Sequence, residues 1–449
     1  RAREYQPRDH KYMAHERKRG ALGALLSYLR LGENAFLEPP RFDRAYPFVL
    51  TLDAGGQMLP EDMLRLIATM AHPINRARVE DGEPSGYAVL APRVQTALSE
   101  QVSEFTALFG GPGGVDTYAS CASDAWQDGS GQGIYSGKGI LDANAFSARL
   151  QGRLPDNRIL SHDLIEGLFA GAGQVNDVTL YEGHPKSLRA WLKRLERWTR
   201  GDWQLLPFAC GWRESERLKP IDRFKLCDNL LRSLLSGGQV ALILAAFWLR
   251  RPEGILFALL PDLLPLIGPG MREGDSWLLA LCRIAFAPLE AACTLRAIGR
   301  ALWRQGVSKR RLLDWVTADD AEKKTGKLPM GFPRLCALAV FASLPLQPLL
   351  LLPGVPLCVL WWTADALSAY LERPREQAFA PDPSQRETLM DLAARTWRFF
   401  EDTVEDNGLP PDNEQLDPPI GLARRTSPTN AALYLMCCVS ARELGLIDG

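Results

Sequence analysis

Residues Ala45–Asp53 (AYPFVLTLD) form an apolar run that ends at an acid, which is the pattern of a buried parallel β-strand. After it, Leu59–His72 carries apolar residues at helical spacing, and Pro60–Asp62 suits a helix N-terminus. Tyr87–Val94 is a second strand candidate. Strands that alternate with helices predict an α/β sheet, in which ligands collect at the carboxyl ends of the strands.

Composition excludes several classes of protein. At roughly 150 residues per domain, 449 residues predict two to four domains. Lys plus Arg number 52 and Asp plus Glu number 53, and this balance argues against a nucleic-acid partner. The nine cysteines form no CxxC pair, so neither a disulfide framework nor a zinc site is expected. Because the chain starts at Arg1 without a signal peptide, we expect a piece of a longer protein.

Hydropathy divides the chain. Residues 1–230 have the composition of a soluble protein, whereas residues 231–371 contain long uncharged runs, among them Leu234–Leu249 and Leu335–Ala364. A membrane helix needs ~20 apolar residues, so the 231–371 region is predicted to be transmembrane. The proline-broken run Leu335–Ala364 allows one tilted span or two short helices that turn back. A buried core helix remains the alternative for Leu234–Leu249.

Two further segments have helical patterns. Residues 277–327 combine apolar positions with a basic series at 296–311, which predicts an amphipathic helix on an anionic membrane surface. A solvated helix on a soluble domain is the alternative. The basic residues, together with Arg250 and Arg251, place the connecting segments in the cytoplasm by the positive-inside rule. Residues 375–449 are polar again and include the amphipathic segment Thr388–Thr403.

Asp53 is the first candidate for chemistry. Nucleotide-sugar transferases of the GT-A type carry a DxD motif after such a strand, whose carboxylates hold Mg²⁺ or Mn²⁺ against the diphosphate. Here the second acid is replaced by Gly55, so we expect Asp53 to bind metal in a weakened site. The alternative for Asp53 is a helix cap.

Asp163 and residues 197–204 are the other candidates. Asp163 lies between a strand-like segment and a helical one, where it can be a general base or an N-cap. In Arg197–Gln204 (RWTRGDWQ), Trp198 and Trp203 can stack on sugar rings, and Arg197 and Arg200 can neutralise a diphosphate.

Together these segments resemble the transferase core of cyclic β-1,2-glucan synthases (glycosyltransferase family 84). The matching motifs occur in family order: Glu16–Gly20 (ERKRG), Thr51–Gln57 (TLDAGGQ), Ala71–Arg76 (AHPINR), Gly137–Asp142 (GKGILD), Pro155–Gly167 (PDNRILSHDLIEG) and Arg197–Gln204. Downstream, Arg310–Glu322, Leu409–Asn413 and Arg425–Asn430 match the region between membrane helices and the start of the cyclising domain.

The resemblance implies a fold and a site. We expect a partial GT-A-like α/β domain over 1–230, a helical transmembrane region over 231–371, and the beginning of an all-α, glycoside-hydrolase-type cyclising domain over 375–449. The first nucleotide-binding strands are expected before Arg1. By motif, Asp163 is the catalytic base, Asp53 belongs to the metal and nucleotide site, and the remaining substrate-binding residues are Lys18, Lys138, Arg197, Trp198, Arg200, Asp202 and Trp203.

The resemblance also implies a function. It predicts an inverting, multi-pass enzyme of the bacterial inner membrane with a cytoplasmic transferase domain. This enzyme would polymerise UDP-glucose into a β-1,2-glucan that a downstream domain cyclises. Its partners would be UDP-glucose, the growing glucan and the lipid bilayer, with no nucleic acid. Because Gly55 removes a metal ligand, the alternative hypothesis is a degenerate transferase that acts as a membrane scaffold or glucan-binding module.

Overall fold

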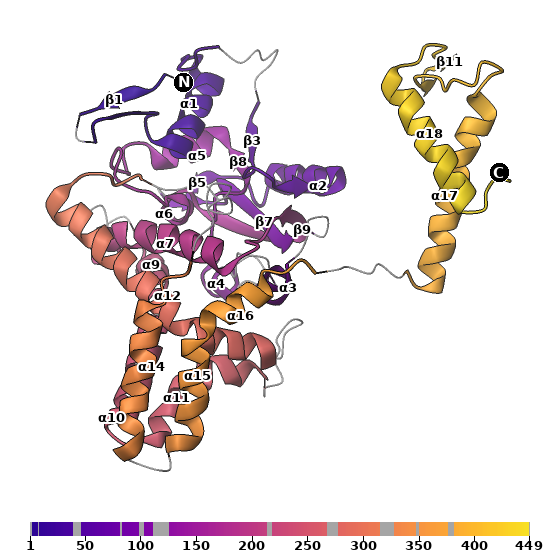
Figure 1. The fold of residues 1–449 in the computed structure, drawn as a ribbon. Coiled ribbons are helices and arrows are strands. Elements are labelled where there is room, and N and C mark those ends of the chain that lie inside the picture. The colour runs from indigo at the N-terminus through magenta and orange to yellow at the C-terminus, as the bar shows by residue number, and fades with distance from the viewer. Residues whose placement is uncertain are drawn as a thin grey trace. The chain divides into compact units, whose positions relative to one another are not determined.

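The computed structural model describes residues 2–7, 9–38, 46–80, 83–97, 103–110, 125–212, 218–266, 277–314, 327–346, 350–375 and 381–448. The chain forms two compact units, Arg1–Arg375 and Glu376–Gly449 (Figure 1). The predicted soluble region 1–230 and the apolar region 231–371 therefore belong to one unit. The long helix α12 (Trp277–Trp303) joins the two regions, because it packs against α7 (Leu188–Gln204) of the first and α10 (Leu235–Trp248) of the second.

A five-stranded mixed sheet lies at the centre of the first unit. Its strand order is β3 (Phe48–Thr51), β8 (Gly139–Asp142), β7 (Val89–Thr96), β9 (Ala172–Glu182) and β4 (Gln57–Met58). Only β7 and β9 pair in parallel; every other neighbouring pair in this sheet is antiparallel.

The prediction that β3 is a buried parallel strand is wrong. Each of its four residues is half-buried, and β3 pairs antiparallel with β8 at an edge of the described sheet. An apolar run reports that a strand faces a core. It does not determine the direction of the neighbouring strand, which here is β8, about 90 residues further along the chain.

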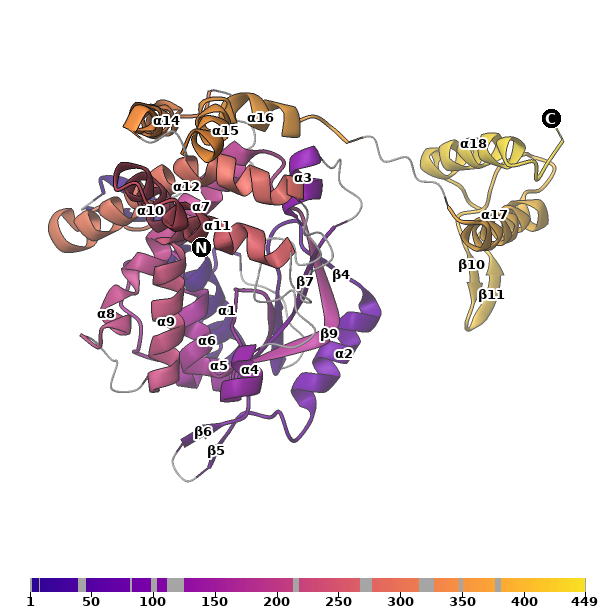
Figure 2. The ribbon, with the colours of Figure 1, turned by 90° about the horizontal axis from the view of Figure 1, so that it is seen from below.

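Helices cover both faces of the sheet (Figure 2). Leu90 and Ile140 pack with α2 (Pro60–Ala71) on one face. Their neighbours Val89 and Leu141 point to the other face. That face is covered by α1 (Arg17–Leu31), α5 (Ala143–Leu150) and α6 (Asp163–Ala170). The predicted helix after Pro60 is confirmed, and the two-residue period of the strands fixes which side chain meets which layer.

Short elements complete the described part of residues 1–230. Two hairpins pair β1 (Glu4–Gln6) with β2 (Lys11–Met13) and β5 (Arg78–Glu80) with β6 (Glu83–Ser85). The small helices are α3 (Glu104–Phe109), α4 (Ala125–Ser130) and α8 (Leu206–Ala209).

The apolar region forms a helical lobe around a core of its own. Its helices besides α10 and α12 are α11 (Pro252–Leu263), α14 (Gly331–Ser343), α15 (Leu351–Trp362) and α16 (Ala364–Leu371). The helix α9 (Pro220–Arg232) packs instead with α7 and α8 in the core of the first region. Fully buried Trp361 anchors this core and donates its indole N–H to the carbonyl of Ile284 at 3.0 Å. The run Leu335–Ala364 contains two helices, α14 and α15, that pack against each other, which is one of the two predicted arrangements.

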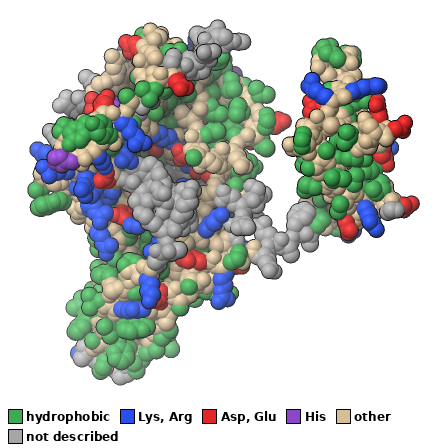
Figure 3. Space-filling view, turned by 45° about the horizontal axis from the view of Figure 1, so that its top comes forward, with side chains coloured by type: hydrophobic (Ala, Val, Ile, Leu, Met, Phe, Trp, Pro, Cys, Tyr) green, Lys and Arg blue, Asp and Glu red, His purple; other side chains and the backbone are tan. Residues whose placement is uncertain are grey.

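Apolar side chains also gather on the surface of this lobe, over α10, α11, α14 and α15 (Figure 3). Among the described residues, the helix Trp277–Ser308 is long and apolar enough to cross a membrane by itself. Two bent pairs, α9 with α10 and α15 with α16, also qualify if each pair counts as one span.

The structure differs from the predicted surface helix over 277–327. The helix runs from Trp277 through a final π-helical turn that ends at Ser308, and residues 315–326 lie outside the described part. Buried residues occur along its length from Leu279 to Ala301. The apolar first half of this segment outweighs the basic series in its second half, so the helix is inserted among other helices.

The second unit contains α17 (Pro383–Thr403) and α18 (Pro428–Glu443). A capping box between Asp382 and Gln385 starts α17, and Tyr434 of α18 packs on Phe400 with ring centroids 5.0 Å apart. The predicted helix Thr388–Thr403 is confirmed. Between the helices a hairpin pairs β10 (Glu414–Leu416) with β11 (Pro419–Leu422). The described part of this unit therefore contains strands, whereas an all-α domain was expected.

Candidate active site

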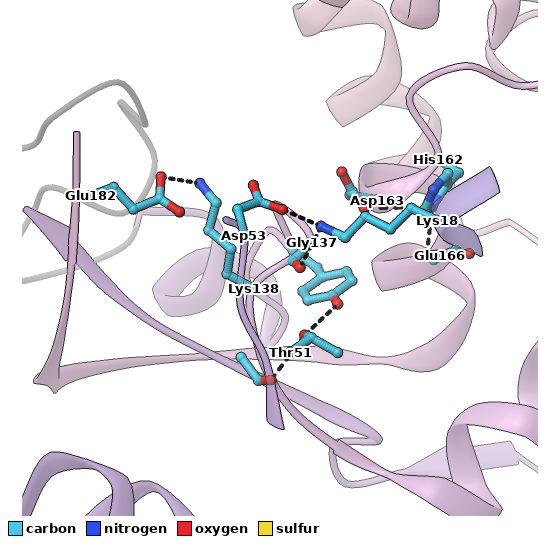
Figure 4. A network of polar contacts seen from close by, with 11 residues as sticks. Lys18, Thr51, Asp53, Gly137, Lys138, His162, Asp163, Glu166 and Glu182 are labelled. Atoms are coloured by element: carbon cyan, nitrogen blue, oxygen red, sulfur yellow. Dashed lines mark hydrogen bonds and ion pairs between the residues drawn. The ribbon is translucent and has the colours of Figure 1, made fainter. Parts of the chain in front are cut away.

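Seven side chains of residues 1–230 form a row of alternating charge (Figure 4). In spatial order they are Glu182, Lys138, Asp53, Lys18, Asp163, His162 and Glu166. They come from β9, the loop before β8, the turn after β3, α1 and α6, so only the folded chain brings them together. Alternation lets acids and bases occupy one partly dehydrated site, because each charge has an opposite neighbour.

Asp53 follows the end of β3 and is held by Lys18 from the first turn of α1. The Lys18 ammonium lies 2.5 Å from Asp53 Oδ1 and donates a second hydrogen bond to the carbonyl of Gly137 at 3.2 Å. Burial raises the pKa of Asp53, but Lys18, Lys138 and Arg197 together lower it by more than burial raises it, so the net shift is downward. The carboxylate is therefore ionised at neutral pH and faces three cations.

Asp163 occupies the first position of α6. The N-cap is His162, and in the described structure no side chain caps this helix, so the alternative reading of Asp163 as a cap finds no support. The carboxylate lies directly against Gly137, where an added Cβ would come within 2.6 Å of Oδ1. Burial lowers the pKa of Lys18, yet Asp163 and Asp53 together raise it above its usual value. Asp163 thus faces the same ammonium that holds Asp53.

Lys138 and Glu182 form the buried end of the row. Their charged atoms are 2.8 Å apart, and the side chains are 10% and 8% exposed. The two residues are 44 positions apart in sequence, and neither spacing nor periodicity links them. Lys138 also faces Asp53, which places this predicted substrate-binding residue within the site.

Arg197 and Trp198 lie on α7 at the border of the site. Burial lowers the pKa of Arg197 and its electrostatic partners Asp53 and Asp163 raise it, with a net downward shift. Trp198 meets Trp191 edge to face, with centroids 6.1 Å apart. Trp191 in turn donates its indole N–H to Glu290 of α12 at 3.0 Å, so the long apolar helix fixes this aromatic pair.

Three predicted substrate-binding residues lie away from the charge row. Arg200 borders a separate cavity of about 330 Å³ with Arg300 and Arg304, and burial together with these arginines lowers its pKa to about 10. Asp202 accepts a hydrogen bond from Asn229 at 3.4 Å, and burial raises its pKa to about 7.

Trp203 is the third of these residues. It packs into an apolar cluster and donates its indole N–H to Ser233 at 2.8 Å. Trp198 and Trp203 are five residues apart on α7, so the helical repeat directs their side chains to different sides of the helix.

A cavity of about 380 Å³ opens between α1, β3 and α6. Lys18, Asp163, His162 and Glu166 supply its polar wall, and Leu22, Leu25 and Val49 are among its apolar residues. A larger cavity of about 640 Å³ lies elsewhere, by the β1–β2 hairpin and Gln204, and its lining contains none of the charge row. The cavity of about 380 Å³ is the candidate active site because Lys18, Asp163, His162 and Glu166 of the charge row line it.

Sequence reasoning missed His162 and Glu166. The imidazole Nδ1 lies 2.8 Å from Glu166 Oε2 and 3.5 Å from Asp163 Oδ1. Their i, i+4 spacing across the start of a helix was the available signal, since such residues lie on one face.

Asp53 is the residue that would hold the expected divalent cation, together with oxygens of a phosphate ligand. Asp53 supplies one carboxylate, and beside Gly55 an added Cβ would meet nothing within 4 Å, so there is space for an ion and its water. Mg²⁺ commonly binds through one or two carboxylates plus phosphate oxygens. Lys18 on Asp53 Oδ1 competes for the same carboxylate and weakens such a site.

The comparisons with known proteins bear on these motifs. No protein-family model matches the chain. Over 490 aligned positions, however, the whole chain is 32% identical to "Cyclic beta-(1,2)-glucan synthase NdvB" of Rhizobium meliloti (strain 1021). The chain is a relative of a cyclic β-(1,2)-glucan synthase. This finding confirms the resemblance inferred from the motifs. The chain spans 17% of the length of that synthase.

Proposed function

We propose that this chain is the catalytic segment of a membrane glucosyltransferase that polymerises glucose from UDP-glucose into β-1,2-glucan. In this proposal residues 1–230 form a GT-A-type domain, and residues 375–449 begin the domain that cyclises the product. The observation that carries the proposal is that Lys18 and Asp163 line one cavity, while Asp53 and Arg197 face them as electrostatic partners. The relationship to a cyclic glucan synthase supports the substrate class.

The proposed reaction is a single inverting displacement. The acceptor 2-hydroxyl oxygen forms a bond to the anomeric carbon, its proton passes to a carboxylate oxygen of Asp163, and the bond to the UDP phosphate oxygen breaks. Lys18, Lys138 and Arg197 stabilise the negative charge that develops on the leaving diphosphate. Trp198 offers an aromatic surface at the border of the site for the acceptor sugar.

We propose that Mg²⁺ or Mn²⁺ binds weakly at Asp53. When bound, the ion would neutralise charge on the diphosphate. Asp53 would hold it with phosphate oxygens and water, since Gly55 supplies no ligand.

We further propose an inner-membrane, multi-pass enzyme with the transferase domain in the cytoplasm and the bilayer around the helical lobe. The candidate membrane helix Trp277–Ser308 and the apolar surface of α10, α11, α14 and α15 support insertion. Basic residues 296–311 and Arg250–Arg251 support this orientation. Reporters fused after Lys219 and after Lys309 should both report cytoplasm, and a periplasmic signal at either position would contradict the topology.

A degenerate transferase that serves as a glucan-binding module is the second candidate, because Gly55 removes a metal ligand. The test is Asp163→Asn in the full-length enzyme. A positioned general base is worth about 10²–10⁴-fold in rate. We therefore expect polymerisation of labelled UDP-glucose to fall by that factor while UDP-glucose binding is unchanged. Parental polymerisation by Asp163→Asn would contradict the proposed base, and a parent that binds glucan but transfers no glucose would favour the binding module.

A further inference from the structure

His162 and Glu166 form a buried pair directly beside the proposed base. His162 is 8% exposed and Glu166 is 2% exposed. The imidazole Nδ1 lies 2.8 Å from Glu166 Oε2, and the same nitrogen lies 3.5 Å from Asp163 Oδ1. A carboxylate as buried as Glu166 requires an opposite charge close by, and the described contact that supplies it is this imidazole.

Nearby groups favour the charged imidazolium. Burial lowers the pKa of His162, but Glu166 and then Asp163 outweigh burial and raise it to about 9. Arg19 of α1 opposes this rise. Tyr135, before β8, is neutral because burial raises its pKa. Lys18 and Arg197 interact electrostatically with Asp163, which lies between them and His162.

We propose that His162 is a positioning residue, kept cationic by Glu166, that holds the Asp163 carboxylate in the orientation in which it accepts the proton of the acceptor hydroxyl. The proposal rests on the proposed role of Asp163 as the base. The imidazolium, fixed by its hydrogen bond to Glu166, lies 3.5 Å from Asp163 Oδ1 and attracts that oxygen electrostatically, which restrains the carboxylate. Glu166 acts through His162, since its described side-chain contact is with that ring and not with Asp163.

The sign of the pH dependence follows from these charges. In the parent the imidazolium persists until the pH approaches about 9. In Glu166→Gln the largest upward influence on the pKa of His162 is lost while burial remains, so that pKa falls toward or below its ordinary value of 6.5. The substituted amide can still accept a hydrogen bond, so the variant removes charge and keeps shape. His162 in the variant therefore loses its charge at a lower pH than in the parent.

The test measures kcat and KM for UDP-glucose from pH 6 to pH 8 in the full-length enzyme. The ratio of Glu166→Gln to parental kcat should fall by about tenfold between pH 6 and pH 8, the scale on which a base loses part of its effect. KM should not change. His162→Asn, which carries no charge at any pH, should have a lowered kcat and a ratio to the parent that does not vary with pH. Glu182→Gln removes an equal charge at the far end of the row, and its ratio to the parent should also be constant.

Two results would overturn the proposal: a Glu166→Gln ratio that is flat across the range, or parental kcat in His162→Asn. If Glu166→Gln fails to fold, as its melting curve would show, His162→Asn decides alone. Asp163→Asn in the same assay separates the two levels of inference. Loss of activity in Asp163→Asn with a flat Glu166→Gln ratio removes only the positioning role, whereas parental activity in Asp163→Asn removes the proposed base itself.

Discussion

Replacing Gly137 with alanine should move the carboxylate of Asp163 without touching its charge. A Cβ at this position would lie 2.6 Å from Oδ1, 2.7 Å from Cγ and 2.8 Å from Oδ2 of Asp163. Ordinary van der Waals contacts are about 3.5 Å, so the whole carboxyl group must retreat by roughly 0.8 Å. The backbone resists a compensating rotation, because the carbonyl of Gly137 accepts a hydrogen bond from Lys18.

This displacement predicts the size of the effect on catalysis. A misplacement of about 1 Å can cost about 10²-fold in rate, so we expect kcat for glucan synthesis to fall by about 10- to 100-fold. Alanine also has to adopt a φ of +90°, which is unfavourable for an L-residue by about 1–2 kcal/mol. The assay is the initial rate of glucose transfer from labelled UDP-glucose, with a melting curve of the same preparation.

Gly152→Ala is the matched control. Gly152 also has a positive φ, +72°, but an added Cβ there would meet nothing within 4 Å. It should therefore share the backbone strain and retain parental kcat. Parental kcat in Gly137→Ala would refute the placement of Asp163 as the base. An equal loss in Gly152→Ala would show that strain alone, and not the carboxylate, accounts for the effect.

Three other perturbations have defined outcomes. Lys138→Met leaves the buried carboxylate of Glu182 unpaired and should destabilise the protein by about 3–5 kcal/mol, seen as a lower melting temperature, whereas adding Glu182→Gln should restore most of it; an unchanged melting temperature would contradict the pairing. Gly55→Asp should tighten Mn²⁺ binding, measured in a titration that follows UDP-glucose binding. Gly55→Ala is the control for the positive φ of +90° at this position. UDP-glucose binding that resists a chelator would remove the metal from the mechanism. Trp198→Ala should raise KM for a glucan acceptor and leave UDP-glucose binding intact, and unchanged KM would exclude sugar stacking at this residue.

The sequence alone was sufficient for features set by neighbouring residues. Apolar spacing and Pro60 located α2, and the pattern over Thr388–Thr403 located α17. The motif around Asp163 placed this residue at the start of a helix, as α6 shows. These predictions succeed because helical periodicity and the chemistry of helix starts are local properties of the chain.

Only the tertiary structure determined which residues meet. Lys18 contacts Asp53 across 35 positions, and Lys138 contacts Glu182 across 44. These contacts form because β3 and β9 run in the same direction, so their carboxyl ends lie at the same end of the sheet, where α1 begins. The sequence predicted that Trp203 stacks on a sugar ring. In the structure α9 packs against this side chain, and its indole N–H donates a hydrogen bond to Ser233. Sequence patterns report which face of an element is buried, whereas partner, strand direction and depth depend on how distant elements pack. The sequence therefore predicted Asp53, Lys18, Lys138 and Asp163 of the charge row. It did not predict Glu182, His162 and Glu166 or the alternating order of charge, because these depend on how distant elements pack.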